Sequence, residues 1–233
     1  VTVAAVLALI LMATSQPETR PREQRVDSSV RSALSAYVFL LRDPHFHGLV
    51  FIGAFGISSF FAYLANSSFI LIDHYGLTPR QYSIAFAANA ASFIGVAQFT
   101  GRLSARFGLV PVVKVAVTAY ALVMTALLLV NLIGIERLDV MLVMLFVGFG
   151  FLGLVIPTTT VLALEEHGTI AGTASALMGT LQFVTGAAVM AVTGLFVDGT
   201  ARPMVAGIAA CALLAWFISW LTLRSARMRG AQV

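Results

Sequence analysis

Neutral side chains that donate and accept hydrogen bonds recur inside long apolar segments of this sequence. An amide in an apolar environment is costly unless it finds a partner, so such side chains should face protein or a water-filled cavity. The pattern fits either hydrogen bonding between helices or contact with a small ligand, and both interpretations stay open. The sets that share a helical face are Ser59, Tyr63 and Asn66; Asn89 and Ser92; and Ser175, Met178 and Gln182. The candidate substrate-binding residues among them are Tyr63, Asn66, Asn89 and Gln182.

Ionisable side chains are confined to the ends of the apolar segments, so no proton relay is visible within them. His45 and His47 are two residues apart, about 200° around a helix, and cannot converge on one metal ion from a single face. Neither a G-x-S-x-G elbow nor an H-E-x-x-H pair occurs. We therefore expect no catalytic residues, no metal site, no cofactor and no enzymatic activity.

The composition is that of an integral membrane protein. Hydrophobic residues make up 59% of the chain, charged residues 10%, and the mean hydropathy is +0.95, whereas soluble domains carry roughly 25% charged residues. The net charge of +4 is not arranged as a basic stripe with interleaved aromatics, so we expect no nucleic-acid partner. The single cysteine, Cys211, lies in an apolar run and is interpreted as a packing residue.

Six apolar segments are long enough to cross the hydrocarbon core of a bilayer, which takes about 20 residues. Asp43 followed by Pro44 predicts the start of the first, and a capping box from Thr78 to Gln81 predicts the start of the second. The predicted spans are 44–72, 79–100, 111–134, 140–164, 169–197 and 203–223. They form a six-helix domain over 44–224, followed by a tail over 225–233.

The first 43 residues differ from the spans. Residues 1–14 are apolar but too short to span a bilayer, and we interpret them as the end of a truncated transmembrane helix, with a signal-peptide core as the alternative. Residues 15–43 form a polar, basic linker. Within it, apolar residues at helical spacing predict an amphipathic helix over 30–41 with Asp27 or Ser28 as its N-cap.

The basic residues predict the orientation. Eleven of the 14 Lys and Arg residues fall on the linker side of the six crossings, and only Arg80, Arg137 and Arg202 fall on the other side. Because Lys and Arg concentrate in cytoplasmic loops, the linker and the C-terminus are predicted to be cytoplasmic.

Small residues predict where helices approach closely. In the fifth span Ala171, Ser175 and Gly179 recur every four residues beside a parallel row of Gly172, Ala176 and Thr180. In the fourth span a glycine-rich stretch leads to Pro157, which should kink or break the helix.

Several of these residues also carry a family resemblance. The segment 172–179, Gly-Thr-Ala-Ser-Ala-Leu-Met-Gly, followed by Gln182 and Phe183, resembles the eleventh helix of the bicyclomycin-resistance and chloramphenicol-efflux (Bcr/CflA) family of drug:proton antiporters, within the major facilitator superfamily. The segment 86–90, Phe-Ala-Ala-Asn-Ala, fits the same family. The segment 101–108, Gly-Arg-Leu-Ser-Ala-Arg-Phe-Gly, is similar to a loop motif of the superfamily, with Ala105 where the fuller motif has aspartate. Ser-Gln-Pro-Glu-Thr at 15–19 is similar to the segment that follows a sixth helix.

The resemblance implies the fold and the function. It implies an all-α C-terminal half of a major facilitator transporter, built from two inverted three-helix repeats whose first and fourth helices line a central cavity. It implies proton-driven export of small amphipathic drugs from the bacterial inner membrane, with the lipid bilayer, protons and a missing N-terminal half as partners. The proton-coupling carboxylate is then expected upstream of Val1. The implied gating residues are Gly101, Arg102, Arg106, Gly108 and Pro157.

Other functions are kept as alternatives. A half-size transporter that forms homodimers, or a superfamily member with a different substrate, fits the same six spans. A membrane enzyme would need a titratable or metal-binding centre inside the spans, and none is visible there. A passive channel stays open as an alternative, although channels usually show a polar ring or a re-entrant loop.

Overall fold

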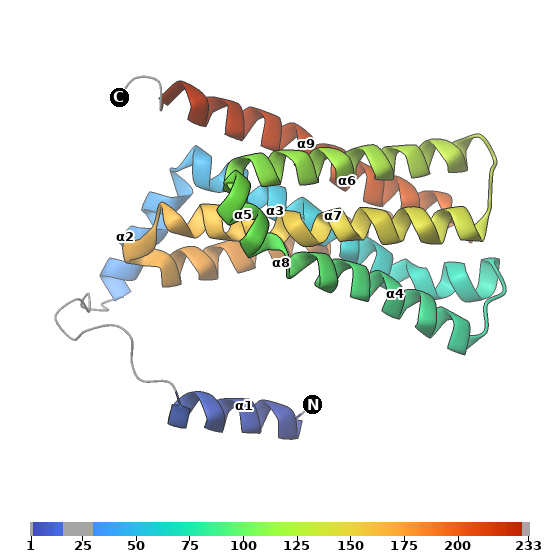
Figure 1. Ribbon diagram of the computed structural model, residues 1–233, viewed down its shortest axis with the longest axis horizontal. Coiled ribbons are helices and arrows are strands. Elements are labelled where there is room, and N and C mark those ends of the chain that lie inside the picture. Colours follow the sequence, from blue (N-terminus) through green and yellow to red (C-terminus); the bar gives the residue numbers. More distant parts are fainter. Residues whose placement is uncertain (1, 16–29, 230–233) are drawn as a thin grey trace. The chain divides into compact units, whose positions relative to one another are not determined.

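A computed structural model of the chain describes residues 2–15 and 30–229, and these residues form helices and short turns without a strand (Figure 1). The chain divides into two compact units, Val1–Ala36 and Tyr37–Val233. In the first unit, helix α1 (Thr2–Ser15) is exposed along its described side chains. A helix, α2 (Val30–Leu41), covers the residues for which an amphipathic helix was predicted, whereas the predicted N-cap lies outside the described residues.

Six helices of the second unit are long and apolar enough to cross a membrane, within the part of the chain that the structure describes. This confirms the predicted number of spans and the all-helical membrane fold. The first span consists of α3 (Pro44–Ser68) and a π-helical end, η2 (Phe69–His74). The others are α4 (Pro79–Ala97), α6 (Leu109–Leu132), α7 (Leu138–Glu165), α8 (Ala171–Gly194) and α9 (Arg202–Arg229).

The first two spans begin where their sequence signals predict. The side chain of Asp43 accepts a hydrogen bond from the His45 N–H at 2.9 Å, and Pro44 takes the first helical position of α3. Before α4, Thr78 and Gln81 form the reciprocal capping box. These caps satisfy N–H groups that the first helical turn leaves without partners.

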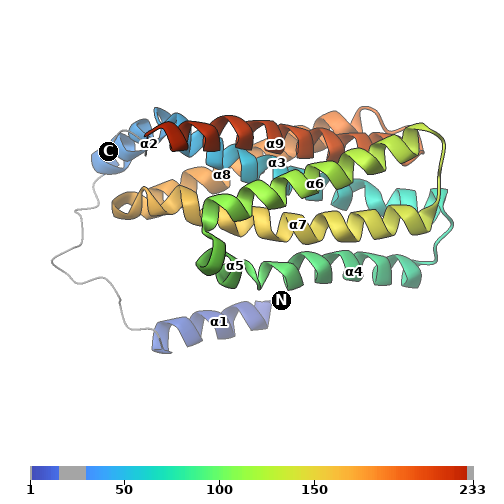
Figure 2. The same cartoon turned by 45° about the horizontal axis from the view of Figure 1, so that its top comes forward.

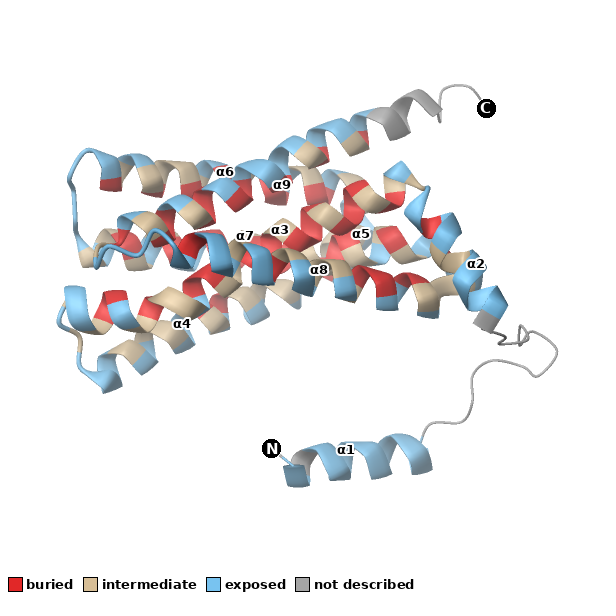
Figure 3. Cartoon of the chain, turned by 180° about the vertical axis from the view of Figure 1, so that it is seen from behind, coloured by how far each residue is buried: buried red, intermediate tan, exposed pale blue. Residues whose placement is uncertain are grey.

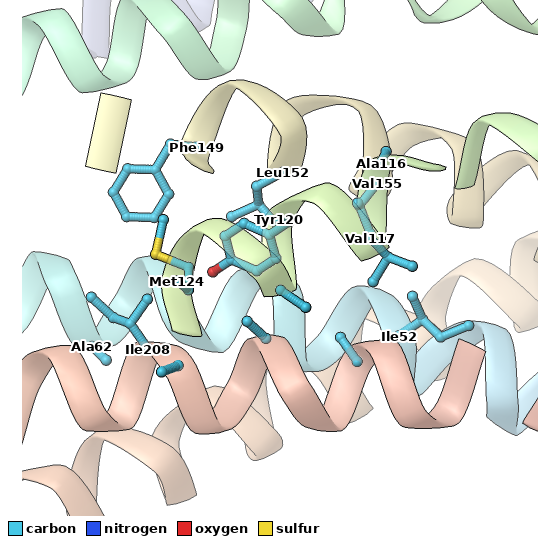
Figure 4. Packing of buried hydrophobic residues seen from close by; sticks show 14 of the residues in the cluster. Ile52, Ala62, Ala116, Val117, Tyr120, Met124, Phe149, Leu152, Val155 and Ile208 are labelled. Carbon is cyan, nitrogen blue, oxygen red and sulfur yellow. The ribbon is translucent and has the colours of Figure 1, made fainter. Parts of the chain in front are cut away.

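Helix α3 lies at the centre of the six-helix bundle and packs against α7, α8 and α9. Helix α6 packs on α7 and α9, whereas α4 packs mainly on α7 (Figures 1 and 2). The core between these helices contains fully buried Tyr120 and Met124 of α6 beside Phe149 and Leu152 of α7 (Figure 4). Buried residues run along the middle of the bundle, and exposed residues face outward (Figure 3). We call the end where α3 begins and α7 ends the linker end.

Glycines bring α7 against its neighbours, as the sequence predicts. A Cβ atom on Gly153 would lie 2.2 Å from the backbone oxygen of Phe93 in α4, and one on Gly150 would lie 2.8 Å from Ser92 Oγ. Only glycine permits this approach. In contrast, Cβ atoms on Gly172 and Gly179 of α8 would meet nothing within 4 Å. These two glycines of α8 therefore do not mark a close approach to another described helix.

Two local predictions differ from the structure. Helix α7 continues through Pro157 from Leu138 to Glu165, so the predicted break does not occur. After the proline, the hydroxyls of Thr158, Thr159 and Thr160 each donate to the backbone carbonyl four residues earlier.

The segment 101–108, which is similar to a loop motif, is helical instead, because residues Thr100–Phe107 form helix α5. Gly101 lies within this helix, and only Gly108, with φ at 83°, has the left-handed backbone that favours glycine.

Candidate functional site

Tyr63 and Asn89 form a polar pair inside the bundle. Asn89 Nδ2 of α4 donates a hydrogen bond to the Tyr63 hydroxyl oxygen of α3 at 3.0 Å, and both side chains are buried. The Tyr63 ring stacks on Phe86 with 5.9 Å between ring centroids and meets the edge of Phe149 at 5.2 Å. Aromatic rings thus pack against Tyr63, and the hydrogen bond between Tyr63 and Asn89 joins the first two spans.

A second polar link lies one turn closer to the linker end. The Tyr120 hydroxyl of α6 donates to Ser59 Oγ at 2.5 Å, and Ser59 in turn donates to the Gly56 carbonyl at 2.6 Å. Ser92 of α4 donates to the Phe146 carbonyl of α7 at 2.7 Å. These neutral groups are satisfied by contacts between helices, as buried polar groups generally are.

Asn66 lines a pocket of about 400 Å³ at the end of the bundle opposite the linker. Its amide nitrogen donates to the Ala62 carbonyl one turn earlier, at 2.8 Å. The pocket lies between the π-helical end of α3 and the segment that joins α8 to α9. Its apolar walls are Phe69, Ile70, Val197, Pro203 and Met204, and its other polar side chains are Asp73, His74 and Thr200. This mixture suits an amphipathic organic molecule.

Charged groups surround this pocket. Glu136 lies 3.6 Å from His74 and 3.5 Å from Arg202, so one carboxylate links the end of the first span to the start of α9. Burial, and secondarily Glu136, raises the pKa of Tyr75 above its ordinary value. Hydrogen bonds from Thr200 hold the pKa of Asp198 below its ordinary value.

Gln182 lies elsewhere in the bundle. A Cβ atom on Gly53 of α3 would come within 3.0 Å of Gln182 Nε2 and 3.2 Å of Thr159 Oγ1, so both polar groups cover this glycine. The half-buried Gln182 amide makes no hydrogen bond to the described residues. Gly53 is ten residues before Tyr63, roughly 15 Å along α3. The structure therefore brings Tyr63 and Asn89 together, and it places Asn66 and Gln182 at two other positions.

An ionic cluster that the sequence does not predict lies at the linker end. His167, 5% exposed, has Nε2 3.1 Å from Asp43 Oδ2 and Nδ1 3.0 Å from the Ala163 carbonyl oxygen. His45 lies 3.4 Å from Glu166. Their position at span ends was evident from the sequence, but the pairing of residues more than 100 positions apart left no local signal. No group of three or more metal-ligating side chains occurs among the described residues.

The arginines of α5 make few contacts. Arg106 lies over the ring of Phe107 at 5.2 Å, a cation–π contact within the helix. Arg102 is exposed, and neither arginine pairs with a carboxylate in the described part of the chain.

Comparisons with known proteins place this geometry in context. The family model described as Major Facilitator Superfamily matches residues 1–190. The chain is 31% identical to an uncharacterized MFS-type transporter, YdgK, of Bacillus subtilis over 85% of this chain and 49% of that protein. It is 25% identical to a bicyclomycin resistance protein homolog of Haemophilus influenzae over 99% of this chain and 58% of that protein. The chain thus spans about half the length of the curated relatives it matches.

Proposed function

The chain belongs to the Major Facilitator Superfamily, and we propose that it forms the C-terminal half of a bacterial exporter that exchanges small amphipathic drugs for protons. Members of this superfamily are transporters, so the expectation that the chain is not an enzyme is confirmed. The finer proposal rests mainly on one observation. The similarity to a bicyclomycin resistance protein homolog extends over 99% of the chain and so includes all six spans.

The surface of the bundle supports a partner half. In the most apolar 18-residue stretch of each span, only 17% of the stretch is buried for the span that begins with α4, and 22% for the span that contains α8. In each of the other four spans at least 44% is buried. Both helices expose rows of small residues at a spacing of four: Ala87, Ala91 and Gly95 on α4, and Gly172, Ala176 and Thr180 on α8. Such rows allow the helices of another bundle to approach closely. We infer that α4 and α8 contact the N-terminal half.

The candidate substrate contacts are those that remain accessible. Asn66 lines the pocket at the end opposite the linker. Gln182 makes no hydrogen bond to the described residues, so it can bind a substrate without breaking one. Tyr63 and Asn89 already satisfy each other, so they would contact a substrate only by exchanging that bond. In our proposal Asn66 and Gln182 are therefore the principal substrate contacts of this half. The linker end faces the cytoplasm, as the distribution of Lys and Arg predicts.

Vesicle transport tests the proposal. Everted membrane vesicles containing the chain joined to an N-terminal six-helix half should release protons when bicyclomycin or chloramphenicol is added, as reported by a pH-sensitive dye. Vesicles containing the 233-residue chain alone should not, because the ionisable side chains of this half lie at the span ends. Proton release by the chain alone would favour a half-size homodimer. The absence of release by the joined protein, with the protein present in the membrane, would contradict drug export.

The carboxylates of this half provide a second measurement. Changing each to its amide in the joined protein should leave pH-dependent transport, because the coupling carboxylate is proposed to lie in the N-terminal half. If one change abolished proton coupling while substrate binding survived, the coupling site would be in this chain. The residues to change are Asp73, Glu136, Asp139, Glu165, Glu166 and Asp198.

A further inference from the structure

A second pocket lies between α6 and α9 near the linker end, on a different part of the bundle from the candidate drug contacts. It has a volume of about 250 Å³. Two cations, two hydroxyls and two indole rings surround it, so its wall combines hydrogen-bond donors with flat apolar surfaces. The lining residues are Lys114, Thr118, Trp216, Ser219, Trp220 and Arg224.

Lys114 is the only lysine of the chain, and it lies near the start of the third span, at the linker end. It comes five residues after the start of α6, about 7.5 Å along the helix. Its ammonium donates to the Leu223 carbonyl of α9 at 3.3 Å, which ties the two helices together at the pocket. An ammonium group has three donors, and the remaining two have no partner among the described residues.

Arg224 supplies the second positive charge. Its guanidinium lies over the ring of Trp220 at 5.1 Å, which holds the group at the rim of the pocket. In the part of the chain that the structure describes, the carboxylates of the ion pairs lie beside other residues, and none pairs with Lys114 or Arg224. Two cations without a compensating carboxylate favour an anionic ligand.

The hydroxyls and the indole rings narrow the choice of anion. Ser219 is 2% exposed, and neither it nor Thr118 has a hydrogen-bond partner among the described side chains or backbone groups. Trp216 and Trp220 are 40% and 49% exposed, as tryptophans at a membrane interface are. One turn further into the span, exposed Leu122 and Leu213 continue the two walls of the pocket. A headgroup among the cations and an acyl chain along these walls would fit together.

We propose that this pocket binds the phosphate group of an anionic phospholipid. Lys114 and Arg224 contact the phosphate oxygens, Thr118 and Ser219 donate hydrogen bonds to the headgroup, and the two tryptophans bracket the start of an acyl chain. Basic pockets between transmembrane helices are known to recognise such headgroups. The bound lipid would fix α6 against α9 at the linker end, which is where most of the basic residues lie.

The chain carries its own reporter for this site, because its only two tryptophans both line the pocket. The 233-residue chain in phosphatidylcholine nanodiscs is titrated with brominated phosphatidylglycerol, whose bromine atoms quench nearby indole fluorescence. Saturable quenching well above that caused by the same fraction of brominated phosphatidylcholine is expected. The double variant Lys114→Gln, Arg224→Gln should weaken the apparent affinity by about 25-fold, since each basic residue near an anionic surface contributes about fivefold.

A matched control removes two charges at the opposite end. Arg137→Gln, Arg202→Gln changes net charge equally but should leave quenching unaltered, because both residues lie far from the tryptophans in ion pairs with acidic residues. If Lys114→Gln fails to fold, the exposed Arg224→Gln variant carries the test with an expected fivefold loss. Equal quenching by the two brominated lipids, or unchanged affinity in the charge variants, overturns the site. Recovery of fluorescence on adding inorganic phosphate would assign the pocket to free phosphate and overturn the lipid proposal.

Discussion

Asp43 and His167 meet at the linker end, with 3.1 Å between the carboxylate and ring Nε2, while ring Nδ1 lies 3.0 Å from the Ala163 carbonyl oxygen. Both ring nitrogens of His167 therefore face oxygens that accept hydrogen bonds, one on a carboxylate and one on a backbone carbonyl. The other charged groups on the packed segments lie beside different partners: His45 pairs with Glu166, and His47 contacts the Leu41 carbonyl. The pair joins the start of the first span to the end of the fourth.

Substitution of Asp43 separates its two roles. Asparagine caps a helix about as well as aspartate, so Asp43→Asn should keep the cap of α3 and lose only the ionic contact, at a cost of about 1–3 kcal/mol in unfolding free energy. Asp43→Ala should cost about 1 kcal/mol more because the cap is lost as well. Unfolding in mixed detergent micelles measures both. Equal stability of Asp43→Asn and the unmodified chain would mean that the pair contributes nothing.

The Tyr63–Asn89 hydrogen bond should contribute to stability as a coupled pair. In a double-mutant cycle with Tyr63→Phe and Asn89→Leu, we expect a coupling energy of about 0.5–1.5 kcal/mol, the range for hydrogen bonds between membrane helices. The same unfolding assay provides the four free energies. A control cycle that pairs Tyr63→Phe with Thr180→Val, an exposed residue of α8, should show no coupling. Additive effects in the first cycle would refute an energetic link.

Glycine substitutions should divide into two classes. Gly153→Ala would place a methyl group 2.2 Å from the rigid backbone oxygen of Phe93, and it should destabilise the bundle by about 3 kcal/mol or more. Gly172→Ala meets nothing within 4 Å and should leave the stability of the isolated chain within about 1 kcal/mol. Thermal unfolding of both variants checks this. If Gly172→Ala proved as damaging as Gly153→Ala, the exposed row of α8 would have to pack within this chain.

Asn66 should affect substrate selection more than folding. Asn66→Leu removes a polar group that bonds only to its own helix, so membrane abundance should stay within about twofold while the range of exported compounds changes. Growth inhibition by a panel of drugs, normalised to immunoblot levels, measures both quantities. Asn89→Leu serves as the comparison, because loss of its buried partner should lower abundance. A collapse of abundance for Asn66→Leu would make Asn66 a structural residue.

Cysteine labelling tests the orientation. With Cys211 replaced by alanine, single cysteines in the 20–43 linker or at Glu165 should resist an impermeant thiol reagent added to intact cells, whereas a cysteine at Thr200 should react. The physical reason is the concentration of Lys and Arg on the linker side. Labelling of the linker from outside, with Thr200 protected, would reverse the proposed topology.

The sequence alone determined the features that depend on neighbouring residues. Apolar length predicted six spans, and Asp43 and the Thr78–Gln81 box predicted two helix starts, because a cap is formed within four residues of its helix. The glycines of α7 predicted close packing, since any side chain there would forbid it. Local rules did not predict that α7 continues through Pro157 without a break, or that Gly101 lies inside helix α5.

Only the tertiary structure decided which distant residues meet. Tyr63 and Asn89 were predicted as separate candidates, and their contact depends on the rotation of α4 about its axis, which packing against α7 sets. The pairing of Asp43 with His167, and of Lys114 with the end of α9, likewise joins positions more than 100 residues apart. The hydropathy of a segment indicates that it lies in the membrane. The partner of a polar group within it depends on how whole helices pack.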